Sequence, residues 1–153
     1  MAHLTQRVQP WLISGLTLAA DQLTKLAITA AFQPGQSLPL LAPILHLTYV
    51  QNTGAAFGLF KGQQALFVLL SLLVIGAIIW ELAAKRVHAA STLWGSGLVL
   101  GGAVGNLIDR LRLGYVIDFI DLRVWPVFNV GDSAITIGVC LLVWQSLRPR
   151  RER

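Results

Sequence analysis

Hydrophobic residues run almost continuously through four stretches of the chain, and short polar segments separate them. An α-helix needs about 20 such residues to cross the hydrocarbon core of a membrane, and each stretch approaches that length. The pattern therefore predicts a mainly α-helical membrane protein with four transmembrane helices in a single integral membrane domain, residues 1–153. The predicted helices cover approximately residues 11–32, 65–84, 91–108 and 128–147.

Composition and charge support this prediction and orient the helices. The chain is 55% hydrophobic and 12% charged, whereas an ordinary soluble domain carries about 25% charged residues. Basic residues lie at Arg7, at Lys85 and Arg86, and in the C-terminal tail 148–153. Because basic residues mark the cytoplasmic side of membrane helices, we expect both termini in the cytoplasm. The net charge of +5 is thus a topology signal, and we expect no nucleic-acid partner.

The segment between the first two helices, residues 35–62, has a different pattern. Pro34, Pro39 and Pro43 exclude a regular helix at its start. The run "ILHLTYV" is typical of a strand, and "NTGAAFG" follows it as a turn with glycine freedom. We therefore expect a small extracytoplasmic β-sheet region, or β-cradle, on the outer membrane surface.

The first hydrophobic stretch also fits a secretory signal peptide, because residues 11–20 are apolar and small residues follow. Asp21 and Lys25 favour a continuing helix instead. They are four residues apart, so they lie on one helix face and can pair. A cleaved peptide would have no use for such a pair.

Small residues recur along the third predicted helix. Gly97, Gly101 and Gly105 are spaced four residues apart, a pattern that lets helices approach closely in lipid. We interpret these glycines as packing positions. The single cysteine, Cys140, excludes disulfides within the chain and cysteine-based metal sites, and we expect neither metal nor cofactor.

Polar side chains beside the predicted helices form the main chemical signal. Such groups are costly in a membrane interior and need partners, so each is a candidate functional residue. Given the predicted topology, nearly all of them belong to the outer half of the membrane. They are Asp21, Lys25, Asn52, Asn106, Arg110, Asp118, Asn129 and Asp132.

Simpler interpretations exist for several of these carboxylates. Asn129 and Asp132 have the spacing of a capping box at the start of the fourth helix. Asp118 could be a surface carboxylate paired with Arg110 or Arg112, although its neighbours in the chain are apolar. We assign the two remaining aspartates of this region to local ion pairing; they are Asp109 and Asp121.

The alternative for Asp118 and Asp132 is catalysis. Two adjacent carboxylates at a low-dielectric boundary share one proton, so one can act as base toward water and the other as acid. That chemistry hydrolyses a peptide without a metal or a nucleophilic side chain. A helix N-terminus favours negative charge, so we expect Asp132 ionised and Asp118 protonated. Neither Ser133 nor the histidines show a triad arrangement.

Four blocks, "DQLTK", "NTGAAFG", "GGAVGNLIDRLRLGYVIDFIDL" and "FNVGDSAI", resemble in order and spacing the motifs of signal peptidase II, the prolipoprotein signal peptidases. The resemblance covers residues 11–147. It implies an aspartyl endopeptidase of the bacterial cytoplasmic (inner) membrane, with its active site near the outer face. The implied substrate is a prolipoprotein, cut before its diacylglyceryl-modified cysteine, and the implied partners are membrane lipids. We expect a monomer.

The resemblance also implies roles for individual residues. The catalytic pair falls on Asp118 and Asp132. Gly131 departs from the family, which usually has alanine there, and we expect this to loosen the first turn of the fourth helix. The supporting residues fall on Asp21, Lys25, Asn52, Gly54, Asn106, Arg110 and Asn129. Of these, we expect Asn106 and Asn129 to donate hydrogen bonds to the carboxylates or the substrate.

Arg110 is expected to organise the end of the third helix or to meet a lipid phosphate, and the Asp21–Lys25 pair to be structural.

A second candidate function is a small ion or proton transporter, for which the intramembrane charges would line a pathway. It predicts ionisable residues through the full bilayer depth. The cytoplasmic half offers few, with Glu81 near the end of its helix, so the sequence favours the peptidase.

Overall fold

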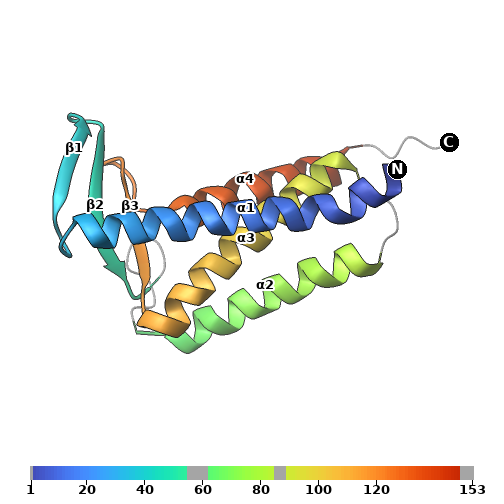
Figure 1. Cartoon of the computed structure of the whole chain (residues 1–153), viewed down its shortest axis with the longest axis horizontal. Coiled ribbons are helices and arrows are strands. Elements are labelled where there is room, and N and C mark those ends of the chain that lie inside the picture. The colour runs from blue at the N-terminus through green and yellow to red at the C-terminus, as the bar shows by residue number, and fades with distance from the viewer. Residues whose placement is uncertain (1, 55–61, 85–88, 149–153) are drawn as a thin grey trace.

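The computed structural model describes residues 2–54, 62–84 and 89–148. Four helices run lengthwise beside one another, a small sheet lies at one end, and both chain termini lie at the other (Figure 1). The mainly helical prediction is therefore confirmed. The elements are α1 (Ala2–Ala31), β1 (Ser37–Leu41), β2 (Leu45–Asn52), α2 (Gln64–Ala84), α3 (Ala90–Leu113), β3 (Val116–Asp121) and α4 (Val130–Leu147).

Among the described helices, α2 and α4 have the length and apolar composition of membrane spans. Their mean hydropathies over the most apolar window are 2.5 and 1.5. None of the residues of α2 is buried within the protein. An apolar helix with no buried residue is stable only where another apolar medium covers it, so the surface of α2 suits lipid. Both helices thus have the composition expected of a membrane protein.

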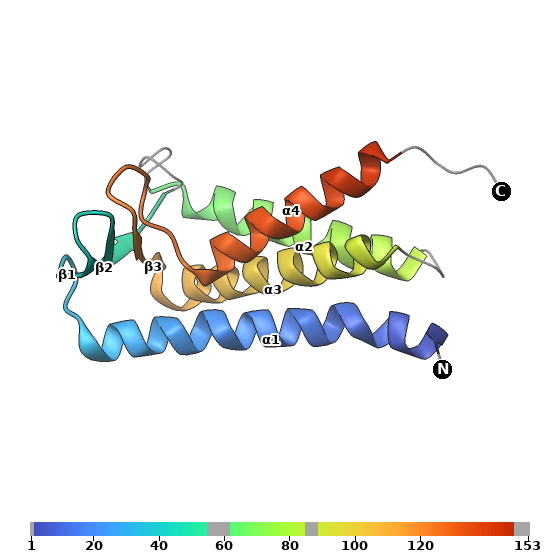
Figure 2. The same ribbon diagram turned by 90° about the horizontal axis from the view of Figure 1, so that it is seen from above.

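Helix α3 is the centre of the bundle, with α1 on one side and α4 on another (Figure 2). Its glycines make both approaches possible. A Cβ atom on Gly101 would lie 2.6 Å from the Ser14 carbonyl oxygen of α1. On the α4 side, a Cβ atom on Gly95 would lie 2.9 Å from the Gly138 oxygen. The predicted packing role of the glycine pattern is confirmed.

The sheet has three antiparallel strands in the order β1-β2-β3. The β1–β2 hairpin confirms the strand predicted in residues 35–62, whereas most of the turn expected after it lies outside the described residues. The prediction did not include the third strand, β3, which comes from the chain after α3. All of β3 except Ile120 is buried. It therefore lacks the alternation of a half-buried strand that would identify it in the sequence.

Two helices extend beyond the predicted hydrophobic stretches. Helix α1 begins at Ala2, and α3 continues to Leu113. Hydropathy marks only the part of a helix suited to lipid, whereas the helix itself continues to its backbone stop signal. For α3 that signal is Gly114, which has a φ of 84° and donates its N–H to the Arg110 oxygen at 3.2 Å. Residues 109–113 therefore remain helical, which fixes where their side chains point.

Adding a methyl group to Gly101 should separate α3 from α1. We expect Gly101→Ala to lower the stability by about 1–3 kcal/mol, because overpacking forces the helices apart. The measurement is thermal unfolding in detergent micelles. Gly15→Ala in α1 is the matched control, since nothing lies within 4 Å of a Cβ atom there and alanine favours the helix by up to about 1 kcal/mol. Equal destabilisation by both substitutions would contradict the packing argument.

Candidate active site

A cavity of about 700 Å³ opens at the sheet end of the bundle. Residues of β2, β3, α2, α3 and α4 line it, so segments distant in the sequence meet there. Most of its wall is apolar, with chemistry concentrated in a few polar groups. The predicted site residues that line the cavity are Asn52, Gly54, Arg110, Asp118 and Asp132.

Asp118 lies in β3 and is only 1% exposed. Its Oδ1 accepts a hydrogen bond from Asn129 Nδ2 at 2.7 Å, and its Oδ2 accepts one from Asn52 Nδ2 at 2.8 Å. Burial, reinforced by the negative charge of Asp132, raises the pKa of Asp118 to about 7 despite these donors. The interpretation of Asp118 as a surface carboxylate paired with an arginine is wrong, because it is buried and its hydrogen-bond partners are amides.

Asp132 occupies the first turn of α4. Its backbone N–H donates to Asn129 Oδ1 at 2.8 Å, and its own Oδ2 accepts from the Asn129 N–H at 3.3 Å. This is the predicted capping box. Asp132 Oδ1 also accepts from Asn106 Nδ2 at 2.8 Å. Capping and a place in the cavity are therefore compatible, because one carboxylate does both.

Groups that can only donate fix the orientation of the amides around these carboxylates. Lys25 Nζ donates to Asn106 Oδ1 at 2.9 Å, so the NH₂ of Asn106 must face Asp132. The Asp132 N–H holds the oxygen of Asn129 in the same way, so the NH₂ of Asn129 faces Asp118.

The third amide follows the same rule. The Gly54 N–H donates to Asn52 Oδ1 at 3.0 Å, which directs the NH₂ of Asn52 toward Asp118. As a result, each of the four carboxylate oxygens of Asp118 and Asp132 accepts a hydrogen bond from an N–H of fixed polarity. The expectation that Asn106 and Asn129 donate to the carboxylates is confirmed.

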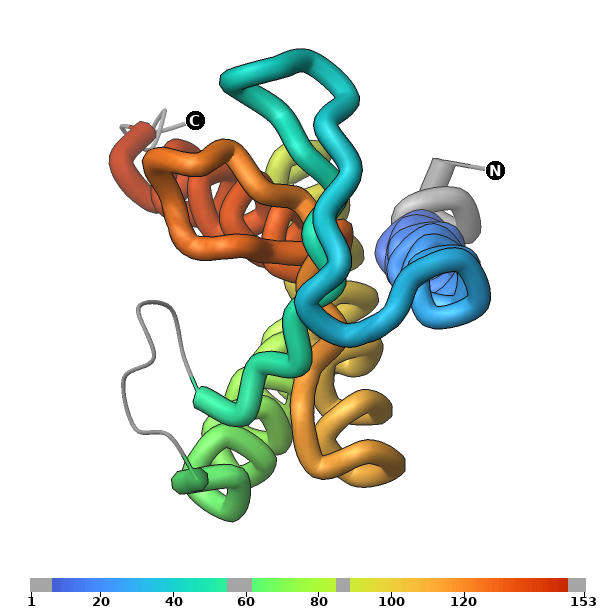
Figure 3. The backbone as a smooth tube through the Cα atoms, turned by 90° about the vertical axis from the view of Figure 1, so that its left-hand side faces the viewer, coloured from blue at the N-terminus to red at the C-terminus, as the bar shows by residue number. Residues whose placement is uncertain are grey.

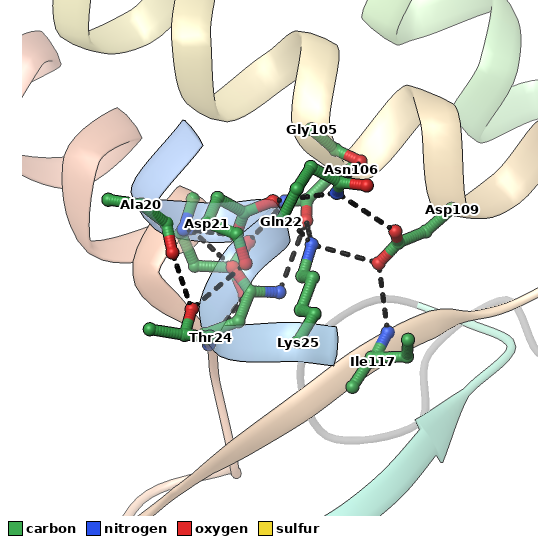
Figure 4. Close-up of polar contacts among 12 residues, drawn as sticks. Ala20, Asp21, Gln22, Thr24, Lys25, Gly105, Asn106, Asp109 and Ile117 are labelled. Atoms are coloured by element: carbon green, nitrogen blue, oxygen red, sulfur yellow. Dashed lines mark hydrogen bonds and ion pairs between the residues drawn. The ribbon is translucent and has the colours of Figure 1, made fainter. Parts of the chain in front are cut away.

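Lys25 forms the centre of a second, adjoining cluster (Figure 4). Its side chain is 2% exposed, and Nζ lies 2.8 Å from Asp21 Oδ2 and 2.8 Å from Asp109 Oδ2. With Asn106 as third acceptor, all three ammonium hydrogens are used. The predicted Asp21–Lys25 pair is confirmed. Asp109 was expected to pair locally, which is wrong: its ion-pair partner lies on α1, and it also accepts the Ile117 N–H at 3.1 Å.

Sequence reasoning therefore missed Asp109 as a supporting residue, and it also missed Gln22. Gln22 Nε2 lies within 3.1 to 3.3 Å of Asp21 Oδ2, the Gly105 oxygen and Asp109 Oδ1. The available signal was spacing, because Asp109 lies one helical turn after Asn106 and so shares its face. Local pairing is confirmed for Asp121, whose Oδ2 lies 3.3 Å from Arg123 Nη1.

Arg110 joins α3 and α2 at the sheet end of the bundle. Its guanidinium carbon lies 5.2 Å from the centroid of the Phe67 ring, and its backbone oxygen accepts from Gln64 Nε2 at 2.5 Å. This agrees with its expected role in organising the end of the third helix.

The first turn of α4 is held firmly at Gly131, contrary to the looseness we expected. The Gly131 N–H donates to Asp21 Oδ1 at 2.8 Å. A Cβ atom on Gly131 would lie 3.0 Å from the same Asp21 oxygen and 3.1 Å from the Gly102 carbonyl oxygen. Glycine at this position permits a close approach of α4 to α3.

Comparison with known proteins agrees with this arrangement. A family model described as signal peptidase (SPase) II matches residues 13–148. The lipoprotein signal peptidase of Moorella thermoacetica is 51% identical over 144 residues, 93% of this chain and 95% of that protein. That of Thermosynechococcus vestitus is 45% identical over 147 residues, 92% of each chain.

Solved structures agree as well. A bacterial membrane enzyme determined by the in meso method at 2.3 Å resolution superposes with a TM-score of 0.86 and 29% identity, over 94% of this chain and 93% of that one. A second such enzyme, at 1.9 Å, gives a TM-score of 0.82 and 31% identity. Fold, site and matches define the class of this protein as an aspartic peptidase of the membrane. Within that class, the chain belongs to the signal peptidase II family.

Removing the ammonium group of Lys25 should destabilise the fold strongly. We expect Lys25→Met to cost roughly 3–5 kcal/mol, because Asp21 and Asp109 would remain buried without a counter-charge. Thermal unfolding in micelles measures the loss. Arg123→Gln is the control, since this half-exposed partner of Asp121 should contribute less than about 1 kcal/mol. A Lys25 variant as stable as the Arg123 variant would disprove the importance of the buried cluster.

Proposed function

We propose that this protein removes the signal peptides of bacterial prolipoproteins by cutting before a diacylglyceryl-modified cysteine, with Asp118 and Asp132 as the catalytic pair. Membership of the signal peptidase II family and the names of the relatives support the substrate class. The observation that carries the assignment of residues is the position of both carboxylates in one cavity, each with oriented donors on both oxygens.

In the proposed mechanism, Asp132 acts as the base and Asp118 as the acid. Asp132 takes a proton from a water whose oxygen attacks the peptide carbonyl, while Asp118 gives its proton to the carbonyl oxygen. Collapse of this intermediate breaks the C–N bond: Asp132 gives its proton to the leaving amine, and Asp118 takes a proton back from a hydroxyl group of the intermediate. The raised pKa of Asp118 supports its role, because at a pKa of about 7 the group holds its proton in about half of the molecules at neutral pH. The position of Asp132 at a helix N-terminus favours its charged form.

The cavity also suits a substrate held in the membrane. Its wall combines polar groups near Asp118 and Asp132 with apolar side chains, including Ile135 and Ile137 of α4. Helix α2 packs mainly against α3, which leaves the α4 side open toward lipid. The signal segment would lie along that side, and its lipid-modified cysteine would reach the cavity. Membrane lipids would surround the complex.

We further propose four membrane spans in the bacterial inner membrane, with the sheet and the cavity near the outer face. The direction of successive helices supports this topology. The chain runs back and forth along the bundle, so both termini lie at the end opposite the sheet (Figure 1). The basic residues Arg7 and Arg148 lie toward that opposite end and favour the cytoplasm there. A monomer suffices for the reaction, because one chain supplies every group that the mechanism uses. No step needs nucleic acid.

A transporter is the weaker candidate. It requires ionisable groups distributed through the depth of the membrane. The buried charged residues among those described instead gather in the network around Lys25 and around Asp118 and Asp132, where the helices meet the sheet. This distribution supports a localised reaction centre.

Replacing either catalytic aspartate should abolish cleavage. We expect Asp118→Asn and Asp132→Asn each to stop the shortening of a purified lipidated preprolipoprotein on a gel, while thermal unfolding stays cooperative. An amide can neither activate water nor supply the acidic proton. Asp121→Asn is the matched control, because Asp121 lies in the same strand but is paired with Arg123.

Continued cleavage by both variants would show that Asp118 and Asp132 are not the catalytic pair. The same assay distinguishes the enzyme class, since a transporter would leave the substrate intact. An unlipidated substrate should be cleaved poorly, and chelators should have no effect on a mechanism that uses only carboxylates.

The pH profile should report the proton on Asp118. Because the acid must be protonated, kcat/KM should fall as pH rises through about 7, the pKa of Asp118. Asn52→Ala removes a donor that favours the ionised carboxylate, so the pKa should rise further and the alkaline limb should move to higher pH. Gln51→Ala, one residue away, should leave the limb in place. A shift to lower pH in the Asn52 variant would refute the assignment of the acid.

A further inference from the structure

The β1–β2 hairpin carries an exposed apolar tip that no part of the proposed mechanism uses. The sequence from residue 37 to 47, "SLPLLAPILHL", contains no Asp, Glu, Lys or Arg. Every residue of β1 is exposed. At the tip, Leu40 is 54% exposed, while Leu41 and Ile44 are each 60% exposed. A contiguous apolar patch of this kind marks a surface that is covered in the working protein.

The position of the hairpin indicates what covers it. Viewed along the helices, the hairpin reaches sideways past the bundle, so its tip lies beyond the described helices (Figure 3). The stretch of α1 from Trp11 to Ala31 is about 30 Å long at 1.5 Å per residue, which matches the thickness of the hydrocarbon core. The hairpin begins at Ser37, shortly after this stretch ends. It therefore lies at the level of the membrane boundary, at the end of the bundle (Figure 1), with its tip displaced sideways from the helices (Figure 3).

The backbone of β1 favours lipid over a second copy of the chain as the cover. An exposed strand edge can pair with another protein through its free N–H groups. Here Pro39 supplies no N–H, and the strand register is irregular between Pro39 and Leu41. Pro43 removes another donor in the turn. These features obstruct edge pairing, and they also reduce the number of unpaired donors that would be costly in an apolar medium.

We propose that the tip of this hairpin, Leu40, Leu41 and Ile44, inserts among the acyl chains of the outer membrane leaflet. Helix α1 also exposes apolar side chains to the surroundings of the bundle, among them Leu23 and Leu26. Polar residues at the base of the hairpin, such as Gln36, remain at the level of the headgroups.

Insertion would set the height of the reaction centre. Strand β2 pairs with β3, and Val50 lies opposite Asp118 in that pairing. A hairpin fixed in the leaflet therefore holds Asp118 at a constant depth relative to a lipid-anchored peptide. The inference rests on the proposed placement of the sheet end at the outer membrane face. It does not depend on Asp118 and Asp132 being catalytic.

Depth measurement tests the insertion directly. In a Cys140→Ser background, Leu40→Cys and Ile44→Cys carry a bimane label at the tip, and Gln51→Cys carries it on an exposed residue of β2 away from the tip. The proteins are reconstituted in phosphatidylcholine–phosphatidylglycerol vesicles, with acyl-chain bromines or aqueous iodide as quenchers. We expect brominated lipid to quench the tip labels at least several-fold more than the Gln51 label, and iodide to show the reverse order.

Tip labels quenched by iodide and untouched by brominated lipid would overturn the proposal. Protection from both quenchers that increases with the protein-to-lipid ratio would also overturn it, in favour of contact between copies. Because the readout is fluorescence, loss of peptidase activity in another variant does not affect it. The proposed cleavage reaction and the proposed insertion can therefore fail separately.

Discussion

The buried ammonium group of Lys25 is the interaction on which the rest of the structure depends. Removing such a charge from water costs several kcal/mol, and only complete pairing compensates for it. Here Asp21, Asp109 and Asn106 take its three hydrogens. Through these acceptors one side chain joins α1 to α3, and Asp109 extends the connection to the start of β3. The close glycine contacts of α3 bring the helices near enough for this pairing.

The ammonium group also orients side chains in the candidate active site, because it can only donate hydrogen bonds. It determines which end of Asn106 faces Asp132, while the backbone of α4 determines which end of Asn129 faces Asp118. The carboxylates are consequently surrounded by donors whose direction cannot reverse. Such preorganisation reduces the rearrangement that a reaction requires. It also explains how Asp118 can be almost fully buried while its pKa stays near neutrality.

Much of this arrangement was accessible from the sequence, since hydropathy marked the helices and the motif blocks supplied Asp118, Asp132 and the amides. What escaped were features that depend on tertiary contacts. Strand β3 is buried on both faces and shows no alternation. Asp109 has arginines beside it in the chain, yet its partner comes from another helix. The end of α3 depends on a backbone stop at Gly114 and not on hydrophobicity.

Asn129 uses its oxygen to start α4 and its nitrogen to hold Asp118. The local folding of this helix and the position of the Asp118 carboxylate are therefore coupled in one equilibrium. A molecule that fills the cavity binds only when the first turn of α4 is folded. By mass action it therefore lowers the population in which this turn has opened. Slower amide hydrogen exchange in the opening turn of α4 would then report occupancy of the cavity, even for a compound that is never cleaved.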